Sequence, residues 1–257
     1  MTIAQILVRL PASELSGGEL THLEHMPVNP VRAAEQHAEY RETLGNHAPL
    51  TILDAIEGQP DSVFVEDALL ALPEAFVLLR SGAVSRRGEA DALATFLPQD
   101  RPVLRISDPA TVDGGDLLWI GKQLFVGLTS RTNTDGVEAL RALLSPFDYV
   151  VESVALADTL HLKTAVTALT PDLLLVNPVW LPDDAFPGFS RLECDPHEPF
   201  AANSLTLGGI VHLAKAHERT AMRLRAAGFS VVAIDQSEFA KMEAGLTCMS
   251  VVIPAAT

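Results

Sequence analysis

The sequence predicts an α/β fold in which five similar units close around a pseudo-fivefold axis, an α/β propeller with a central pocket. Three observations predict this fold. The chain has 257 residues, 48% of them hydrophobic, which is enough apolar material for a large core. Short apolar runs alternate with amphipathic helical patterns, and one kind of segment recurs at intervals of 40 to 49 residues. Units this small cannot bury their own apolar faces, so we expect them to close on themselves.

The recurring segment is a polar or small pair of residues that leads into a strand. Its five copies span residues 66–70, 115–119, 163–167, 203–207 and 247–251. A second strand follows in most units, at residues 75–80, 124–128, 173–176 and 210–214. An ordinary α/β sandwich with units that are similar by chance is the alternative to a closed array. No linker is visible, so residues 1–257 are expected to form a single domain.

Helices come next in each unit. Residues 90–97, 136–144 and 216–227 carry apolar side chains at i, i+3 and i+4 spacing, and an earlier helix over 31–44 follows Pro30. Third strands then close the units, at residues 103–106, 149–154, 230–234 and 50–53. The third unit departs from this pattern. Two prolines and a glycine between Pro178 and Cys194 predict a loop or one short turn in place of a long helix.

The charge balance limits the class of partner. The chain has 33 acidic and 18 basic residues, a formal net charge of −15. This argues against nucleic acid and against an anionic membrane surface, because both need a basic face. An acidic field permits a cationic small molecule. No apolar stretch reaches the roughly 18 residues of a membrane span, no signal peptide is visible, and two cysteines are too few for a secreted disulfide scaffold. A cytoplasmic location is expected.

In a closed array, the recurring segments and the loops beside them face one central pocket. Their polar residues are Asp61, Glu66, Asp67, Asp113, Asp116, His161, Lys163 and Cys248. One thiol, one imidazole and several carboxylates suit covalent catalysis on a cationic group. Taken alone, however, Cys248 is typical of a buried core residue, and His161 of a hydrogen-bonded structural histidine.

Three other motifs give weaker evidence of function. Cys194 lies between acidic residues that disfavour its thiolate, so it is expected to be non-catalytic. The histidines His22 and His25 near Glu24 lack the spacing of a metal site, and we expect no metal. The segment Asp113-Gly114-Gly115-Asp116 is not a nucleotide loop, because the sequence has neither of the glycine-rich nucleotide-binding motifs. Its carboxylates repel phosphate and suit a guanidinium or ammonium group, and a strand-entry turn with solvated acids is the equal alternative.

Several segments, read together, resemble the dimethylarginine dimethylaminohydrolase family of the pentein superfamily of guanidino-group-modifying enzymes. They are residues 113–118, 127–133, 160–164, 201–204 and 246–251, with 60–67 and 85–87 fitting as well. The resemblance runs from about Arg9 to Ile253 in the family's order. It implies a five-bladed α/β propeller, no cofactor, and a small guanidino amino acid as partner. The implied reaction converts Nω-methylated L-arginine to L-citrulline and methylamine or dimethylamine through a covalent cysteine S-alkylthiouronium.

The resemblance also implies the role of each site residue. Cys248 would be the nucleophile, His161 the general acid and base, and Asp113 the carboxylate that orients His161 and helps to hold the guanidinium. The residues implied in substrate binding are Leu10 as the lid position, Asp61 at the amino end, Glu66 and Asp67 at the guanidinium, Arg86 and Arg131 at the α-carboxylate, and Met242 through its backbone near the amino acid end.

Two other functions are open at this point. Another pentein hydrolase, such as an arginine or agmatine deiminase, would use the same chemistry, although the arginine pair favours a substrate with a carboxylate. A non-catalytic guanidino-compound binding protein is the alternative outside enzymes. Thr129-Ser130, Glu243-Ala244, Met249 and residues 180–187 depart from the family's pattern, are expected at the rim of the pocket, and put substrate choice in doubt. An exposed blade edge would also permit a homodimer.

Overall fold

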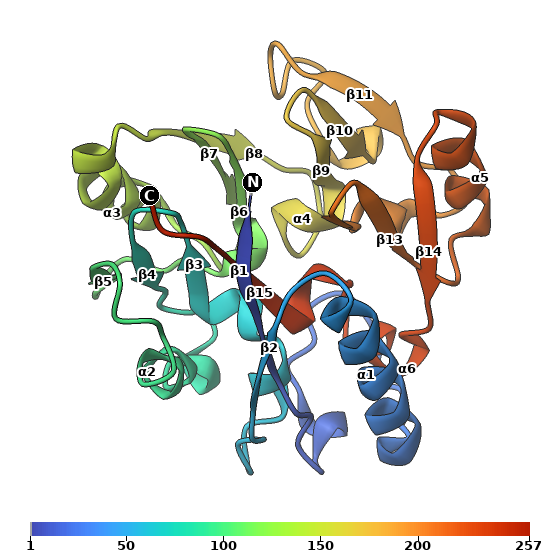
Figure 1. The fold of residues 1–257 in the computed structure, drawn as a ribbon, viewed down its shortest axis with the longest axis horizontal. Coiled ribbons are helices and arrows are strands. Elements are labelled where there is room, and N and C mark those ends of the chain that lie inside the picture. The colour runs from blue at the N-terminus through green and yellow to red at the C-terminus, as the bar shows by residue number, and fades with distance from the viewer. Residues whose placement is uncertain (1) are drawn as a thin grey trace.

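The computed structural model describes residues 2–257, which form five three-stranded sheets around a common axis (Figure 1). In every sheet the first and middle strands run antiparallel, and the middle and outer strands run parallel. The predicted repeat of five ββαβ-type units is therefore confirmed, with one unit lacking its helix.

The strands of four blades follow one another in the chain: β3 (Leu69–Ala71), β4 (Phe76–Leu78) and β5 (Val103–Arg105); β6 (Leu117–Ile120), β7 (Gln123–Leu128) and β8 (Val150–Ala155); β9 (Val166–Thr170), β10 (Leu173–Val176) and β11 (Ser190–Glu193); β12 (Leu205–Leu207), β13 (Ile210–Ala214) and β14 (Ser230–Ile234). The α-helices are α1 (Pro30–Gly45), α2 (Glu89–Ala94), α3 (Thr134–Leu144), α4 (Leu162–Ala165), α5 (Glu218–Ala226) and α6 (Ser237–Ala240).

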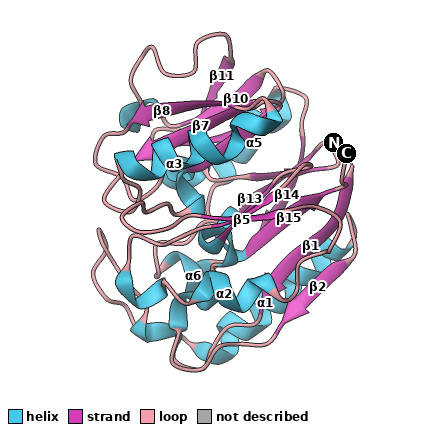
Figure 2. Cartoon of the chain, turned by 90° about the vertical axis from the view of Figure 1, so that its left-hand side faces the viewer, coloured by secondary structure: helices cyan, strands magenta, loops and turns pink. Residues whose placement is uncertain are grey.

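The fifth blade joins the two ends of the chain. Its strands are β15 (Ser250–Pro254), β1 (Ile3–Arg9) and β2 (Leu50–Leu53), in that order. The first strand pairs antiparallel with the last, so the N- and C-terminal ends lie side by side (Figure 2). The ring of blades is thus closed by strand pairing.

Caps in the sequence set where the long helices begin. The Asn29 side chain accepts hydrogen bonds from the N–H groups of Val31 and Arg32, and Pro30 occupies the first position of α1. Asn133 caps α3 in the same way, accepting from Gly136 N–H. Both helices therefore begin one or two residues before the start that apolar spacing alone predicts.

Apolar residues form five buried clusters, one between each pair of neighbouring blades. Successive side chains of β1 point to opposite faces of its sheet, so this one strand contributes to two of the clusters. Ile6 and Val8 pack toward α1 and the β12–β14 blade, whereas Leu7 packs toward the β3–β5 blade. Side chains on both faces of each blade are thus removed from water, which holds the blades together around the axis.

The third unit has no long helix, as predicted, but the expectation of only loop or one short turn there was wrong. A 3₁₀ turn, η7 (Pro178–Trp180), is followed by the outer strand β11, which pairs with β10. This strand has four residues, with Leu192 as its one aliphatic member, and none of them is fully buried. Such a short, polar outer strand carries too little apolar periodicity to be recognised in the sequence. Among all the described residues, no helix combines the length and apolar character needed to cross a membrane.

Candidate active site

A short helical turn opens the first strand of every blade. These turns are η3 (Val65–Ala68), η5 (Gly114–Asp116), α4 (Leu162–Ala165), η8 (Pro199–Ala202) and η9 (Thr247–Met249). They correspond to the recurring segments of the sequence. Because the first strands lie nearest the axis, the five turns bring polar residues from distant parts of the chain into one ring.

Hydrogen bonds between side chains and backbone join neighbouring turns. Asp67 Oδ1 accepts from Gly115 N–H at 2.9 Å, and Asp116 Oδ1 accepts from Leu162 N–H at 3.0 Å. The Thr247 hydroxyl donates to Glu66 Oε2 at 2.7 Å. Asn203, which follows η8, exchanges two bonds with Thr247. The ring is therefore built from bonds that fix its own carboxylates.

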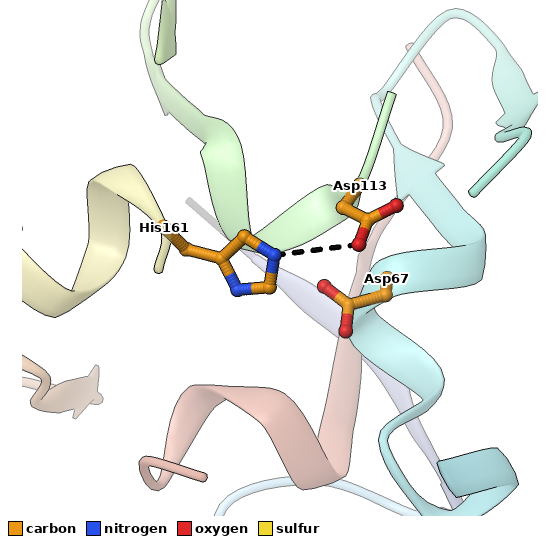
Figure 3. Close-up of side chains that lie close together, drawn as sticks. All are labelled: Asp67, Asp113 and His161. Atoms are coloured by element: carbon orange, nitrogen blue, oxygen red, sulfur yellow. Dashed lines mark hydrogen bonds and ion pairs between the residues drawn. The ribbon is translucent and has the colours of Figure 1, made fainter. Parts of the chain in front are cut away.

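His161 and Asp113 lie against each other in this ring. Figure 3 shows the imidazole facing the Asp113 carboxylate, with His161 Nε2 and Asp113 Oδ2 3.3 Å apart, and the Asp67 carboxylate beside them. Gly115 makes room for the imidazole, because a Cβ at that position would lie 2.5 Å from His161 Nδ1. Gly82 N–H donates to the other oxygen of Asp113 and holds that carboxylate in place.

The carboxylates around His161 favour its protonated form. Burial lowers the pKa of His161, but Asp67, Asp116 and Asp113 together raise it to about 9. The same burial raises the pKa of Asp116 to about 6. At neutral pH the imidazole therefore carries a proton that it can donate.

Cys248 sits in η9, two residues before β15, and its Sγ accepts a hydrogen bond from Gly245 N–H at 3.4 Å. Burial, with the charges of Glu66 and Asp67, raises the pKa of the Cys248 thiol to about 12. Lys163 Nζ lies 2.6 Å from Glu66 Oε1 and offsets part of that negative charge. Without a further cation, this cysteine is a neutral thiol.

Arg86 is buried and held by acids on two sides. Its guanidinium donates to Asp67 Oδ2 at 2.7 Å and binds Glu89 through two nitrogens, at 2.9 and 2.8 Å. Burial raises the pKa of Asp67, but the charges of Arg86 and His161 and the hydrogen bonds from Arg86 and Gly115 together lower it to about 2. Asp67 is therefore ionised next to His161 at any neutral pH.

The segment between β1 and α1 covers one side of the site. Glu19 N–H donates to Asp61 Oδ2 at 2.9 Å, and Arg131 Nη2 donates to the Thr21 hydroxyl at 3.1 Å. The Glu243 carboxylate accepts from three successive backbone N–H groups, those of residues 21–23. Residues 19–23, which we call the covering segment, are thus fastened to side chains of the site.

Two cavities meet at Cys248 and His161. The smaller, of about 30 Å³, is bordered by Asp61, Arg86 and Arg131. The larger, of about 410 Å³, extends to the other blades; we call it the outer cavity. The residues that line both are Leu160, His161, Glu243, Ala244 and Cys248.

Most of the residues singled out in the sequence meet here. Those that border one or both cavities are Asp61, Glu66, Asp67, Arg86, Arg131, His161, Met242 and Cys248, and Asp113 lies directly behind His161. Lys163 also borders the larger cavity, and Asp116 is buried within the ring and borders neither cavity. Leu10 lies outside the ring. It follows β1, donates its N–H to Leu53 O, and borders neither cavity. Residues 19–23 cover the site instead.

Sequence reasoning missed two acids of the site. Glu89 holds Arg86 and lies three residues after it, a spacing at which side chains on one helical turn meet, so the signal was present. Glu243 fastens the covering segment from a left-handed backbone conformation, with φ of 60°. Nothing in its local sequence indicates that role.

Asp67, Asp113 and His161 also offer ligand atoms within 4.8 Å of one another, close enough for one metal ion. Both oxygens of Asp67 already accept bonds, from Arg86 and Gly115, and Asp113 accepts one from Gly82. The Arg86 guanidinium is thus already bound to the Asp67 carboxylate that a metal ion at this place would need as a ligand.

Five blades with a polar ring on their axis define this protein as a pentein. Two solved structures share the arrangement. A cysteine-to-serine variant of DDAH from Pseudomonas aeruginosa, complexed with citrulline, superposes with a TM-score of 0.92 at 32% identity and covers 98% of this chain and 100% of its own. The N-terminal domain of the arginine dihydrolase ArgZ shares the fold with a TM-score of 0.88 at 23% identity, over 100% of this chain and 99% of that one.

No family model matches the sequence. Curated relatives do. The chain is 38% identical to the N(G),N(G)-dimethylarginine dimethylaminohydrolase of Streptomyces coelicolor over 98% of this chain and 97% of the relative. It is 33% identical to the protein of that name from Pseudomonas aeruginosa, over 95% of this chain and 97% of the relative. The chain therefore belongs to the dimethylarginine dimethylaminohydrolase family.

Proposed function

We propose that this chain hydrolyses Nω-methylated L-arginine, both the asymmetric dimethyl and the monomethyl form, to L-citrulline and dimethylamine or methylamine. The observation that carries this proposal is the meeting of Cys248 and His161 with the carboxylates of Glu66 and Asp67 on one axial ring. A thiol, a protonated imidazole and two acids are what attack on a guanidinium carbon requires.

The substrate cation would activate the nucleophile. Burial and the charges of Glu66 and Asp67 raise the pKa of the Cys248 thiol to about 12 in the structure as it stands. A guanidinium bound against those carboxylates offsets their charge, which lowers the thiol pKa, and the proton leaves to solvent. Thiolate would therefore form when the substrate binds.

The Cys248 thiolate then attacks the guanidinium carbon and gives a tetrahedral intermediate. His161 donates its proton to the departing nitrogen, the C–N bond breaks, and the amine leaves an S-alkylthiouronium on Cys248. The neutral imidazole next takes a proton from water, which attacks the same carbon. Collapse of the second intermediate expels the thiolate and releases the ureido product. Asp113 orients the imidazole throughout and favours its charged form.

The amino acid end of the substrate would bind in the smaller cavity. Asp61 suits the ammonium group, the backbone at Met242 borders the same space, and the guanidinium groups of Arg131 and Arg86 suit the carboxylate. As it stands, that cavity has about 30 Å³, room for one or two waters. Glu19 N–H occupies Asp61 and the Thr21 hydroxyl occupies Arg131, so substrate binding must displace the covering segment.

The direct test is turnover of three guanidino compounds by the purified chain: asymmetric dimethylarginine, arginine and agmatine. We expect citrulline and dimethylamine from the first and no ureido product from agmatine, which lacks the carboxylate for Arg131. Cys248→Ser is the matched control and should abolish turnover. Failure to form citrulline from dimethylarginine would overturn the proposal, and faster turnover of arginine would assign an arginine-deiminating activity instead. A homodimer and a cytoplasmic location stay predictions.

A further inference from the structure

The outer cavity is far larger than the methyl groups of the proposed substrate require. Its volume of about 410 Å³ falls within the range of about 300–1,000 Å³ that is typical of pockets for whole ligands. It borders Cys248 and His161 directly, but not Asp61, Arg86 or Arg131. A substrate held by its amino acid end at those three residues leaves this space to whatever is attached to the reacting guanidinium.

With the amino acid end of the substrate in the smaller cavity, the leaving group beside His161 faces the outer cavity. If His161 protonates the departing nitrogen, that nitrogen lies next to the imidazole, which lines the outer cavity together with Glu66 and Cys248. A substituent on the departing nitrogen would extend away from the charged compartment. The wall that it meets then determines which substituents are accepted.

Two aromatic rings form part of that wall. Trp180, from η7, and Phe200, from η8, have ring centroids 5.4 Å apart with planes tilted by 48°. Phe200 is 50% exposed although it is large and apolar. Leu160 adds aliphatic surface, and the charged Lys215 and Asp235 also border the cavity. Such a surface gains by covering its exposed rings with another apolar or aromatic group.

We propose that this protein also hydrolyses arginines whose ω-nitrogen carries an alkyl or arylalkyl group larger than methyl, with that group held in the outer cavity. This inference rests on the proposed function, because the same thiol and imidazole act. The C–N bond to the substituted nitrogen breaks, one water is consumed, and citrulline and the protonated primary amine are the products. No oxidant or further co-reactant is needed.

The test compares three substrates of the full chain: asymmetric dimethylarginine, Nω-propyl-L-arginine and Nω-benzyl-L-arginine. Citrulline and each free amine are measured. We expect kcat/KM for the two larger substrates to lie within tenfold of that for dimethylarginine. Turnover of dimethylarginine with a more than hundredfold loss for both larger substrates overturns this inference alone. Absence of turnover with all three overturns the proposed function and this inference together.

A variant locates the substituent. Ala216 is exposed and borders the outer cavity, so Ala216→Trp narrows it without touching the axial ring. We expect kcat/KM for the benzyl substrate to fall at least tenfold and that for dimethylarginine to stay within twofold. Ala226→Trp, on an exposed position of α5 that borders neither cavity, is the matched control and should change neither value. An equal loss for both substrates in Ala216→Trp would show that the outer cavity holds the amino acid end, which overturns the inference.

Discussion

His161 and His37 are both buried imidazoles, 6% and 0% exposed, in two differently built regions of the molecule. The pKa of His161 is raised to about 9, whereas burial and the charge of Arg41 lower the pKa of His37 to about 4. His161 lies among carboxylates on the axial ring. His37 lies in α1 against the rings of Tyr40 and Phe239, and neither of its ring nitrogens has a hydrogen-bond partner among residues 2–257.

Burial acts in the same direction on both histidines, since it disfavours the charged imidazolium. The two pKa values differ because carboxylates surround His161 and raise its pKa, whereas none is among the causes of the shift at His37. The turns that open β3 and β6 place Asp67, Asp113 and Asp116 around His161, whereas the charge that acts on His37 is that of Arg41. The comparison teaches that the blade-opening turns, rather than depth in the fold, create a proton donor at neutral pH.

The largest expected effect is the loss of that donor. His161→Ala should lower kcat for dimethylarginine by roughly 10²–10⁴-fold, because the departing amine then leaves without general acid catalysis. Initial rates of amine release measure the change. His37→Phe is the matched control and should leave kcat unaltered. A drop of less than tenfold in His161→Ala would remove this histidine from the mechanism.

A smaller effect is expected at the carboxylate behind His161. Asp113→Asn removes one of the charges that raise the pKa of His161, so the imidazole should titrate at lower pH and kcat should fall by at least about tenfold. NMR titration of His161 and the alkaline limb of the kcat profile should shift together. Asp108→Asn, at an exposed acid paired with Arg80, serves as the control. An unmoved titration of His161 would contradict the electrostatic role of Asp113.

Stability at alkaline pH should depend on His161. Its folded pKa of about 9 exceeds the unfolded value of about 6.5, so the folded state binds the proton more tightly. The resulting stabilisation is fully present below pH 6.5 and is lost as the pH rises toward 9, on the order of 3 kcal/mol in the free energy of unfolding. Urea titrations across this range measure it. In His161→Asn the alkaline loss should shrink, and an unchanged slope would contradict the raised pKa.

Stability at acid pH should depend on His37, with the opposite sign. Its folded pKa of about 4 lies below the unfolded value of about 6.5. The unfolded chain therefore takes up a proton first as the pH falls from 6.5 to 4, which lowers the free energy of unfolding by about 3 kcal/mol. His37→Phe should remove this part of the acid sensitivity. If the free energies of unfolding of wild type and His37→Phe instead change in parallel over this pH range, the folded protein protonates His37 as readily as the unfolded chain does, and its pKa is not lowered.

The repeat in the sequence predicted the ring because the five turns share one pattern of polar residues leading into an apolar strand. That pattern alone pointed to Asp67, His161 and Cys248, and the resemblance added Arg86 and Arg131, which lie in loops between strands. The strand limits of β2, β13 and β14 were also predicted to the residue, since each is a short and mostly apolar run.

What the sequence could not predict depends on contacts between distant residues. Glu243 fastens residues 21–23 across more than 200 positions, and no local spacing encodes that contact. The resemblance placed Leu10 at the lid, but the hydrogen bond from its N–H to Leu53 O extends the blade, and Leu10 borders neither cavity. The unpaired state of His37 is likewise set by the rings that α6 and α1 bring around it.

The pairing of β1 with β15 has a consequence for how this protein is made. The blade that carries Cys248 combines β1 with β15, the first and last of the described strands, and Val8 pairs with Ser250, two residues after the nucleophile. Until β15 has been synthesised, the strands of the other four blades are already present, while β1 lacks its antiparallel partner. The thiol therefore reaches its place among the acids only after the other blades have been synthesised, so a partly synthesised chain holds the imidazole and carboxylates but no nucleophile.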